Sequence, residues 1–184
     1  DMGVNMAGNC IIDDEVCREA SLKEIVRRYY KCMCDQKVSG VVKQDRFKLE
    51  LLMNQAGIAP GDREVEKKAA ACSEAIDGAP AAAIELADGS IVTGKTGPLL
   101  GAASSALLNA LKRLAGIDQE IDLVSSKAIE PIQQLKTTYL GSKNPRLHTD
   151  EILIALSSSA YENPIAAAAM RELPKLRGCD IHTT

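Results

Sequence analysis

The sequence predicts a protein of the α+β or α/β class, with a helical lobe over residues 1–78 followed by a layered α/β/α domain over residues 79–184. Two observations support this division. Apolar side chains recur at helical spacing between glycine stops in the first part, whereas short β-branched runs alternate with helical stretches in the second. A chain of 184 residues has room for one ordinary domain or two small ones.

Three helices are expected in the helical lobe. The Asp13-Asp14 pair can cap a long helix that runs to about Lys37, before a stop at Ser39-Gly40. A second helix is expected over residues 41–55, and a third, opened by a proline, over residues 60–75. Their apolar faces are too narrow for a deep bundle core, so the lobe is expected to lean on the rest of the protein or on a partner.

The second part alternates strands and helices. Asp88-Gly89, between two apolar runs, predicts a hairpin turn that joins strands over residues 81–86 and 90–93. The remaining expected elements, in chain order, are helix 99–114, strand 121–124, helix 127–138, a helix beginning near Thr149 or Asp150, a helix beginning at Asn163-Pro164, and a strand over 178–184.

The string Gly89–Thr96 matches the phosphate-binding pattern G-x-x-x-x-G-K-[ST]. A functional phosphate loop needs a strand that ends before the first glycine and a helix that begins at the Lys-Thr end. Here the residues between the glycines, Ser90–Thr93, are mostly β-branched and favour a strand, while Asp88 makes the first glycine part of a hairpin signal. A P-loop nucleotide hydrolase is therefore disfavoured.

Composition excludes several function classes. The net charge is −3 with both signs mixed along the chain, and there is one Phe and no Trp. The basic face and stacking aromatics of a nucleic-acid-binding protein are therefore lacking. No apolar run approaches a membrane span, and the lack of a signal peptide indicates a cytoplasmic protein whose six cysteines are reduced. A chain that begins at Asp1 rather than Met is expected to be a fragment of a longer protein.

The cysteines and histidines do not form a metal motif. Cys32 and Cys34 diverge by roughly 200° around a helix. Cys179 and His182 lie three apart in an expected strand and therefore face opposite sides. The remaining cysteines have no ligand spacing either: Cys10, Cys17 and Cys72. No metal and no other cofactor is expected, and the thiols are interpreted as buried or half-exposed.

The loop over residues 94–101 is one candidate ligand site. Its glycines, Gly97 and Gly101 among them, permit close approach of a ligand to the backbone, and a helix N-terminus follows. Lys95 and Thr96 would add a positive charge and a hydroxyl, which together suit an anion. The alternative interpretation is a tight strand-to-helix turn with an exposed lysine.

A second candidate loop precedes a helix start, over residues 142–150. Its polar residues are Lys143, Asn144, Arg146, His148 and Thr149. Arg146 suits bidentate binding of a phosphate or carboxylate, and histidine side chains titrate near neutral pH, which suits His148 to act as an acid or base. The alternative is a loop whose Asn and Thr cap the backbone and whose Arg bridges surface carboxylates.

Several stretches of the chain resemble one known family. They are 91–96, 98–102, the Gly-Ser-Lys-Asn-Pro-Arg-Leu-His-Thr-Asp-Glu string at 141–151, Gly178-Cys179, and the opening 2–8 with 12–14. Together they are similar to the carboxy-terminal part of the prokaryotic family named domain of unknown function 1846, across essentially the whole chain. Family members are longer, so the resemblance implies an amino-terminal α/β domain and a tail after Thr184 that this chain lacks.

The resemblance also implies that residues 79–184 adopt a cytidine-deaminase-like α/β/α fold, truncated at the carboxy terminus. Zinc deaminases place a His or Cys ligand and a Glu at the start of the helix after the hairpin, and further ligands come from Pro-Cys-x-x-Cys. The corresponding residues here, 101–105, contain none of these, and no Cys-x-x-Cys occurs in the chain. Zinc deamination is therefore excluded.

These observations favour a metal-independent domain that binds a nucleotide or phosphorylated small molecule. Lys95 and Arg146 would hold the negative charge, and His148 would move a proton if chemistry occurs. The alternative is a non-catalytic assembly or interdomain module of a larger protein. The expected partners are the anionic ligand, the missing amino-terminal domain and further copies in a homo-oligomer, with no nucleic acid and no membrane.

Overall fold

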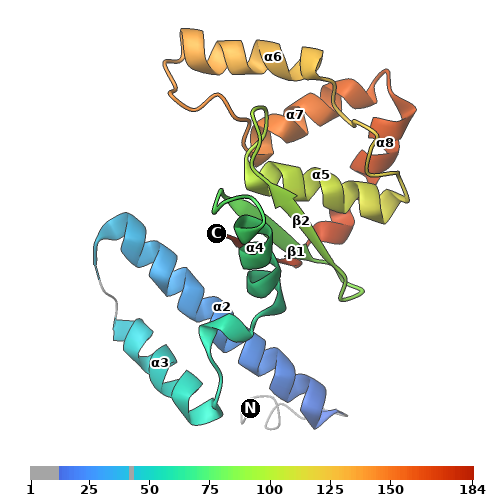
Figure 1. Ribbon diagram of the computed structural model, residues 1–184. Helices are drawn as coiled ribbons and strands as arrows, with labels where there is room; N and C mark the ends of the chain where they lie inside the picture. The colour runs from blue at the N-terminus through green and yellow to red at the C-terminus, as the bar shows by residue number, and fades with distance from the viewer. Residues whose placement is uncertain (1–12, 42–43) are drawn as a thin grey trace. The chain divides into compact units, whose positions relative to one another are not determined.

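The computed structural model describes residues 13–41 and 44–184, and the chain divides into two compact units, residues 1–63 and 64–184 (Figure 1). The expected division after residue 78 differs from this one, because α4 (Glu64–Glu74) packs against the strands of the second unit. The opening motif at residues 2–8 and the thiol of Cys10 lie outside the described residues.

The part of the first unit that the structure describes is a pair of helices followed by a single turn. α2 (Asp14–Ser39) begins at Asp13, whose Oδ1 accepts a hydrogen bond from Val16 N at 3.0 Å, and it ends at Gly40 with φ 70°. α3 (Gln44–Ala56) packs against α2. The buried residues of the pair are Val26, Leu49 and Met53. The predicted first and second helices are therefore confirmed.

The predicted third helix is wrong at its start. Pro60 opens a 3-10 turn, η1 (Pro60–Asp62), rather than an α-helix. Asp62 Oδ2 folds back to accept a hydrogen bond from Ala59 N at 2.7 Å, which closes the turn after three residues. Arg63 is then extended, with φ −71° and ψ 122°, so the α-helix begins only after it.

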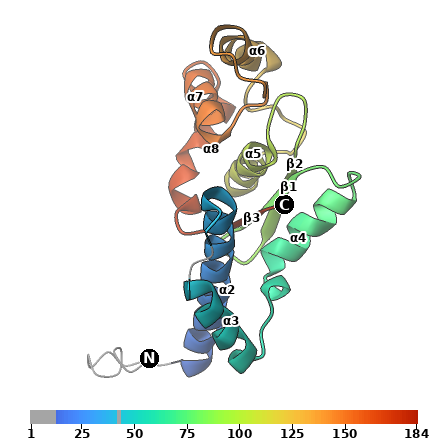
Figure 2. The same ribbon diagram turned by 90° about the vertical axis from the view of Figure 1, so that its left-hand side faces the viewer.

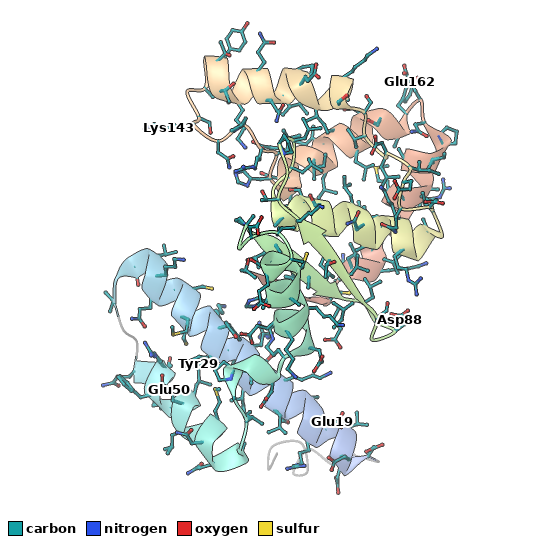
Figure 3. The ribbon with its side chains drawn as sticks, in the orientation of Figure 1. Glu19, Tyr29, Glu50, Asp88, Lys143 and Glu162 are labelled. Carbon is teal, nitrogen blue, oxygen red and sulfur yellow. The ribbon has the colours of Figure 1, made fainter. Side chains whose placement is uncertain are left out.

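Polar contacts join α2 to α3. Tyr29 Oη donates to Glu50 Oε1 at 3.4 Å, and the two side chains approach each other in Figure 3. Arg46 bridges the same pair of helices, since its Nε donates to Glu50 Oε1 at 2.8 Å and its Nη1 to Gln36 Oε1 at 2.9 Å. The small buried core and these polar contacts agree with the narrow apolar faces seen in the sequence.

The second unit combines a small sheet with helices. After α4 its elements, in chain order, are β1 (Ala81–Glu85), β2 (Ile91–Lys95), α5 (Ala102–Ala115), α6 (Ser126–Gln134), the π-helical turn η2 (Leu135–Tyr139), α7 (Thr149–Ala160), α8 (Pro164–Arg171), the 3-10 turn η3 (Leu173–Leu176) and β3 (Asp180–Thr183). Its larger core lies among α5, α6, α7 and α8, with Leu111, Leu147 and Leu156 fully buried.

The sheet has the strand order β2-β1-β3, and both pairings are antiparallel. Alternate residues of β1 face opposite helices, because successive side chains of a strand point to opposite faces. Ala82 and Ile84 pack with Ala106 of α5, whereas Ala83 packs with Val65 of α4. The sheet is thus covered on both faces, by α4 and by α5 (Figure 2). A small antiparallel sheet with helices makes the chain an α+β protein.

The predicted hairpin is confirmed, and it accounts for the phosphate-loop string. Asp88 Oδ1 accepts hydrogen bonds from Ser90 N at 2.9 Å and from Ser90 Oγ at 2.6 Å, and Gly89 adopts φ 79°. β2 then runs to Lys95 and pairs with β1. The string Gly89–Thr96 is therefore a turn followed by a strand, without the strand–loop–helix order that a phosphate loop requires.

Gly94 lets α5 approach β2 closely. A Cβ atom added at this position would lie 2.1 Å from Ala106 N and 2.5 Å from Ala106 Cα, which are backbone atoms of the helix. Any side chain at residue 94 would therefore push α5 away from the sheet. The close approach that the glycine permits is taken by the protein's own helix.

The expected strand at residues 121–124 is wrong. Leu123 and Val124 are buried, but they pack among the helices of the larger core, where no neighbouring strand edge offers ladder partners. The expected helix at 99–114 begins later, at Ala102, because Leu99 and Leu100 are held in an extended segment beside Leu147.

The other predicted elements of the second unit are confirmed within a few residues. α5 ends at Gly116 with φ 65°, and α8 begins at Asn163, whose Oδ1 accepts from Ile165 N at 2.9 Å before a first-turn proline. The expected helix at 127–138 is α6 continued by the π-helical turn. The expected last strand is β3.

Candidate functional site

The two candidate loops lie side by side. Leu100 and Leu147 form a parallel bridge, in which Leu147 N donates to Leu99 O at 2.9 Å and Gly101 N donates to Leu147 O at 3.1 Å. Buried Ser104 adds a third bond, from its Oγ to Leu147 O at 2.9 Å. We call residues 96–101 and 141–149 together the loop pair. Although Leu100 and Leu147 are 47 positions apart in the sequence, the loop pair is one structural element.

Arg146 is held in place across the loop pair. Its Nε donates to Gly97 O at 2.8 Å, and its backbone N donates to Asn144 Oδ1 at 3.1 Å. The side chain is exposed, and within residues 13–41 and 44–184 no hydrogen bond or ion pair uses its two Nη atoms. The guanidinium is therefore fixed at one edge and open at the other. The alternative interpretation of the sequence expected Arg146 to bridge surface carboxylates. Among the described residues its guanidinium contacts no carboxylate.

A buried lysine ties the loop pair to α7. Lys136, which is 8% exposed, donates from Nζ to Arg146 O and to Glu151 Oε2, both at 2.7 Å. The same carboxylate oxygen accepts from His148 N at 2.7 Å, so Glu151 caps the start of α7. Burial would raise the pKa of Glu151, but the bonds from Lys136 and from His148 N outweigh it, so the pKa lies below its ordinary value of 4.5.

Sequence reasoning missed Lys136, although a signal was present. Ile129, Ile132 and Lys136 follow one another at the three- and four-residue spacing of a single helical face. Ile129 and Ile132 belong to the core, so the third member of that face was bound to be at least partly buried. A lysine on a buried face needs a carboxylate or carbonyl partner.

The remaining predicted residues of the second loop lie around Arg146. His148 and Thr149, at the start of α7, are both exposed. Lys143 is also exposed, on the connection between the π-helical turn and α7 (Figure 3). Asn144 is half-buried and caps Arg146 N with its side chain, as the alternative interpretation of this loop expected.

The first loop contributes less than its composition suggests. The amides of Thr96, Gly97 and Gly101 donate to Pro80 O, Leu100 O and Leu147 O, so none is free to bind a phosphate. Lys95 is exposed, but the alternation along β2 places it on the sheet face that α4 covers, together with Ile91. The structure therefore brings Thr96, Gly97 and Gly101 beside Arg146 and directs Lys95 toward the other face.

Comparison with known proteins identifies the family. A model described as "Domain of unknown function DUF1846, C-terminal" matches residues 61–184, and one described as "Domain of unknown function DUF1846, N-terminal" matches residues 1–57. The chain belongs to the DUF1846 family. The junction between the two matches lies close to the boundary between the two structural units at residue 63. The resemblance proposed from the sequence motifs is confirmed.

DUF1846 relatives carry the name "UPF0371 protein". Those from Corynebacterium aurimucosum and Corynebacterium efficiens are each 55% identical over all 184 residues, and one from Streptococcus pneumoniae serotype 19F is 50% identical over the same length. The chain spans 37% of the length of each of these relatives.

No metal site is present in the part of the chain that the structure describes, since no three His, Cys, Asp or Glu side chains cluster there. Its cysteines are free thiols, and burial raises the pKa of Cys179. No helix among residues 13–41 and 44–184 is both long enough and apolar enough to cross a bilayer.

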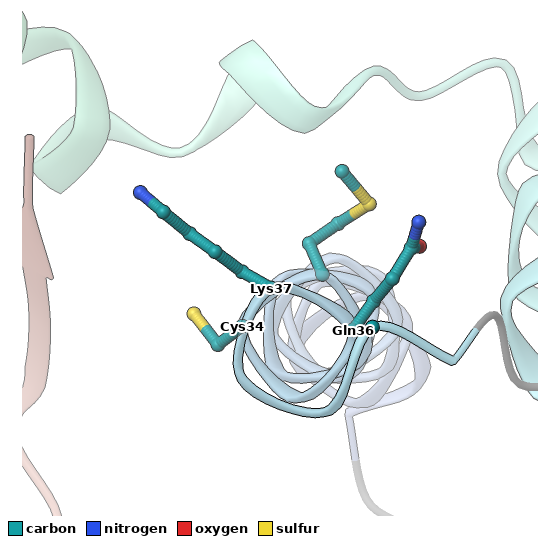
Figure 4. A pocket seen from close by; sticks show the side chains of 5 residues that line it. Cys34, Gln36 and Lys37 are labelled. Carbon is teal, nitrogen blue, oxygen red and sulfur yellow. The ribbon is translucent and has the colours of Figure 1, made fainter.

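A hollow of about 400 Å³ lies at the end of α2, in the first unit. Its lining residues are Met33, Cys34, Gln36, Lys37 and Gly40. All five come from one helix and its cap, and in Figure 4 the side chains of Cys34, Gln36 and Lys37 spread outward from the helix axis. A hollow lined from one helix holds a ligand on one side only, so it is a weaker candidate than the loop pair.

Proposed function

We propose that the second unit binds a nucleotide or a phosphorylated small molecule at the loop pair, with Arg146 as the main anion-binding residue. The contact between Arg146 Nε and Gly97 O, at 2.8 Å, carries this proposal. It restrains a side chain that normally has many conformers, so less entropy is lost when a ligand binds. The two Nη groups suit two oxygens of a phosphate.

The start of α7 supplies the second set of contacts. A helix N-terminus favours negative charge, and Thr149 offers a hydroxyl there. Lys143 would add a positive charge from the neighbouring connection, and His148 would transfer a proton if the ligand reacts. The proposed site uses no metal. Lys95 would lie outside the main set of contacts, because strand alternation puts it on the other face of the sheet.

We further propose a cytidine-deaminase-like arrangement for the second unit and a cytoplasmic location for the protein. A hairpin followed directly by a helix that packs across the sheet supports the first. Free thiols in the described part of the chain agree with the second.

Thermal unfolding with a panel of nucleotides and sugar phosphates, with and without Mg²⁺, tests the site. A ligand at about 100 times its dissociation constant adds roughly 2.7 kcal/mol, which raises the midpoint by several degrees. Arg146→Ala should abolish the shift, whereas Arg177→Ala, which removes an exposed arginine outside the loop pair, should keep it. A shift that survives Arg146→Ala would contradict the proposal, as would a panel in which no compound raises the midpoint.

The second candidate function is a non-catalytic assembly or interdomain module. Large apolar side chains are exposed on the π-helical turn, on the residue that ends it and on α7: Leu135, Tyr139, Leu140 and Ile154. Exposed apolar surface of this kind marks protein–protein contacts. Sedimentation of the chain with and without Leu140→Glu tests a homo-oligomer. A change to a smaller species supports assembly through this surface, and unchanged sedimentation argues against it.

A further inference from the structure

A pocket of about 240 Å³ lies along α5, on the side that faces residues 122–129. Three polar side chains of α5 line it at successive helical turns: Ser105, Asn109 and Lys112. Its apolar wall consists of Leu99, Leu100, Leu108, Leu123, Val124 and Ile129. Asp122 and Ser126 complete the lining. The pocket therefore combines one positive charge and a few hydroxyl and amide groups with an aliphatic wall.

Lys112 is the unusual member of this lining. It is 6% exposed, and its Nζ donates one hydrogen bond, to Gln119 O at 2.8 Å. Among the described residues it forms no ion pair, and Asp122, the carboxylate of the lining, is itself exposed. An ammonium group carries three donors, and burial of its charge without a counter-charge is costly. An anion in the pocket would offset that cost.

The size and lining of the pocket limit the ligand. At roughly 30 Å³ per water molecule, the volume is that of about eight waters, which suits a short organic molecule rather than a nucleotide. A single lysine balances one negative charge, and the leucine-rich wall suits a hydrocarbon group. Both features match a monoanion with an aliphatic body better than a phosphate, which carries more charge and no apolar surface.

We propose that this pocket binds a small aliphatic carboxylic acid, with its carboxylate paired to Lys112 Nζ and its hydrocarbon group against Leu108, Leu123 and Ile129. Asn109 is fixed beside it, because its Nδ2 donates to Thr93 O at 2.9 Å. The side-chain oxygen of Asn109 remains as an acceptor for a hydroxyl or amino group on the ligand. This site is separate from Arg146 and does not depend on phosphate binding at the loop pair.

The test uses isovalerate as the probe and amide chemical shifts of the ¹⁵N-labelled 184-residue chain as the readout. Its neutral analogue isovaleramide has the same hydrocarbon group and no charge. We expect saturable shifts at Asn109 and Leu123 with isovalerate, and an affinity for isovaleramide that is lower by about tenfold or more. Inorganic phosphate should leave these two amides unchanged.

Two variants test whether Lys112 supplies the positive charge that binds isovalerate. Lys112→Met keeps the aliphatic length of the side chain and should weaken isovalerate binding by about tenfold or more. Lys127→Met, the same substitution at an exposed lysine that does not line the pocket, should bind as the wild type does. The comparison of isovalerate with isovaleramide on the unmodified chain still decides the matter if Lys112→Met fails to fold.

Three results would overturn the assignment. One is the absence of saturable shifts at ~10 mM isovalerate, a range in which a ligand of this size should bind. Another is equal binding of isovalerate and isovaleramide, since the pocket would then recognise only the hydrocarbon group. The last is a folded Lys112→Met variant that binds isovalerate as tightly as the wild type.

Discussion

Two buried lysines of the second unit, Lys136 and Lys112, are exposed to similar extents, 8% and 6%, but have different partners. Lys136 Nζ has a carboxylate and a carbonyl acceptor, and it joins the π-helical turn, the second loop and α7. Lys112 Nζ has one carbonyl acceptor, from the segment that follows its own helix. Lys136 therefore joins three segments of the second unit, whereas Lys112, which has no ion pair among the described residues, is the basis for the carboxylate binding proposed above.

The loop pair and the α5 pocket show the same contrast. In the loop pair the amides of Gly97, Gly101 and Leu147 bond within the pair, whereas the Nη atoms of Arg146 have no partner among the described residues. In the pocket the hydrogen bonds of the lining residues are fewer and the space between them is open.

Gly94→Ala should have the largest effect, because it displaces the helix that both regions share. The new Cβ would overlap the backbone of α5 at Ala106, which a change of rotamer cannot relieve. We expect a loss of about 3 kcal/mol or more in the free energy of unfolding, measured by urea denaturation. Gly97→Ala is the matched control, because a Cβ there meets no atom within 4 Å. Equal stability of the two variants would show that α5 does not depend on this close approach.

Lys136→Met and Lys112→Met should have different effects on the free energy of unfolding. Loss of Lys136 leaves Glu151 without its counter-charge and Arg146 O without its donor, so we expect a loss of about 2–3 kcal/mol. Loss of Lys112 removes an unmatched buried charge, so its stability in ligand-free buffer should stay within about 1 kcal/mol of the wild type. Urea denaturation measures both, and a larger loss for Lys112→Met would reverse the comparison.

The pH dependence of stability should show a smaller effect, which comes from the ion pair between Lys136 and Glu151. The pKa of Glu151 is lower in the folded chain than its ordinary value of 4.5, so this group stabilises the fold above that pH. The contribution is lost as the pH falls below 4.5 and through the folded pKa. Glu151→Gln should therefore lower stability at neutral pH, and the difference from the wild type should shrink on acidification. A difference that is constant from pH 7 to pH 3 would exclude this origin.

The sequence was informative where local chemistry decides the structure. Asp88-Gly89 predicted the hairpin and Asn163-Pro164 the start of α8, because each signal acts within a few residues. The stretch at residues 121–124 was misread, since a short apolar run is equally compatible with a strand and with a buried loop. Leu123 and Val124 are buried, but the backbone conformation of this stretch depends on what surrounds it.

The sequence indicated which residues form the candidate site but not how they are arranged in space. Arg146 and Gly97 stand in loops that the sequence singled out, yet only the bridge between Leu100 and Leu147 shows that these loops meet. Lys95 was grouped with them from its place in the chain, whereas strand alternation directs it elsewhere. Lys112 was passed over because a lysine at the end of a helix is normally solvated.

The pairing of β1 with β3 has a consequence for synthesis. Ala81 and Thr184 exchange hydrogen bonds, from Thr184 N to Ala81 O at 3.0 Å and from Ala81 N to Thr184 Oγ1 at 3.1 Å, although 103 positions separate them. At ribosomal rates of roughly 5–20 residues per second, one edge of β1 stays unpaired for roughly 5–20 s after it emerges. During this time the unpaired edge could pair with a neighbouring polypeptide. The small alanine side chains of β1 offer such a polypeptide little apolar contact area.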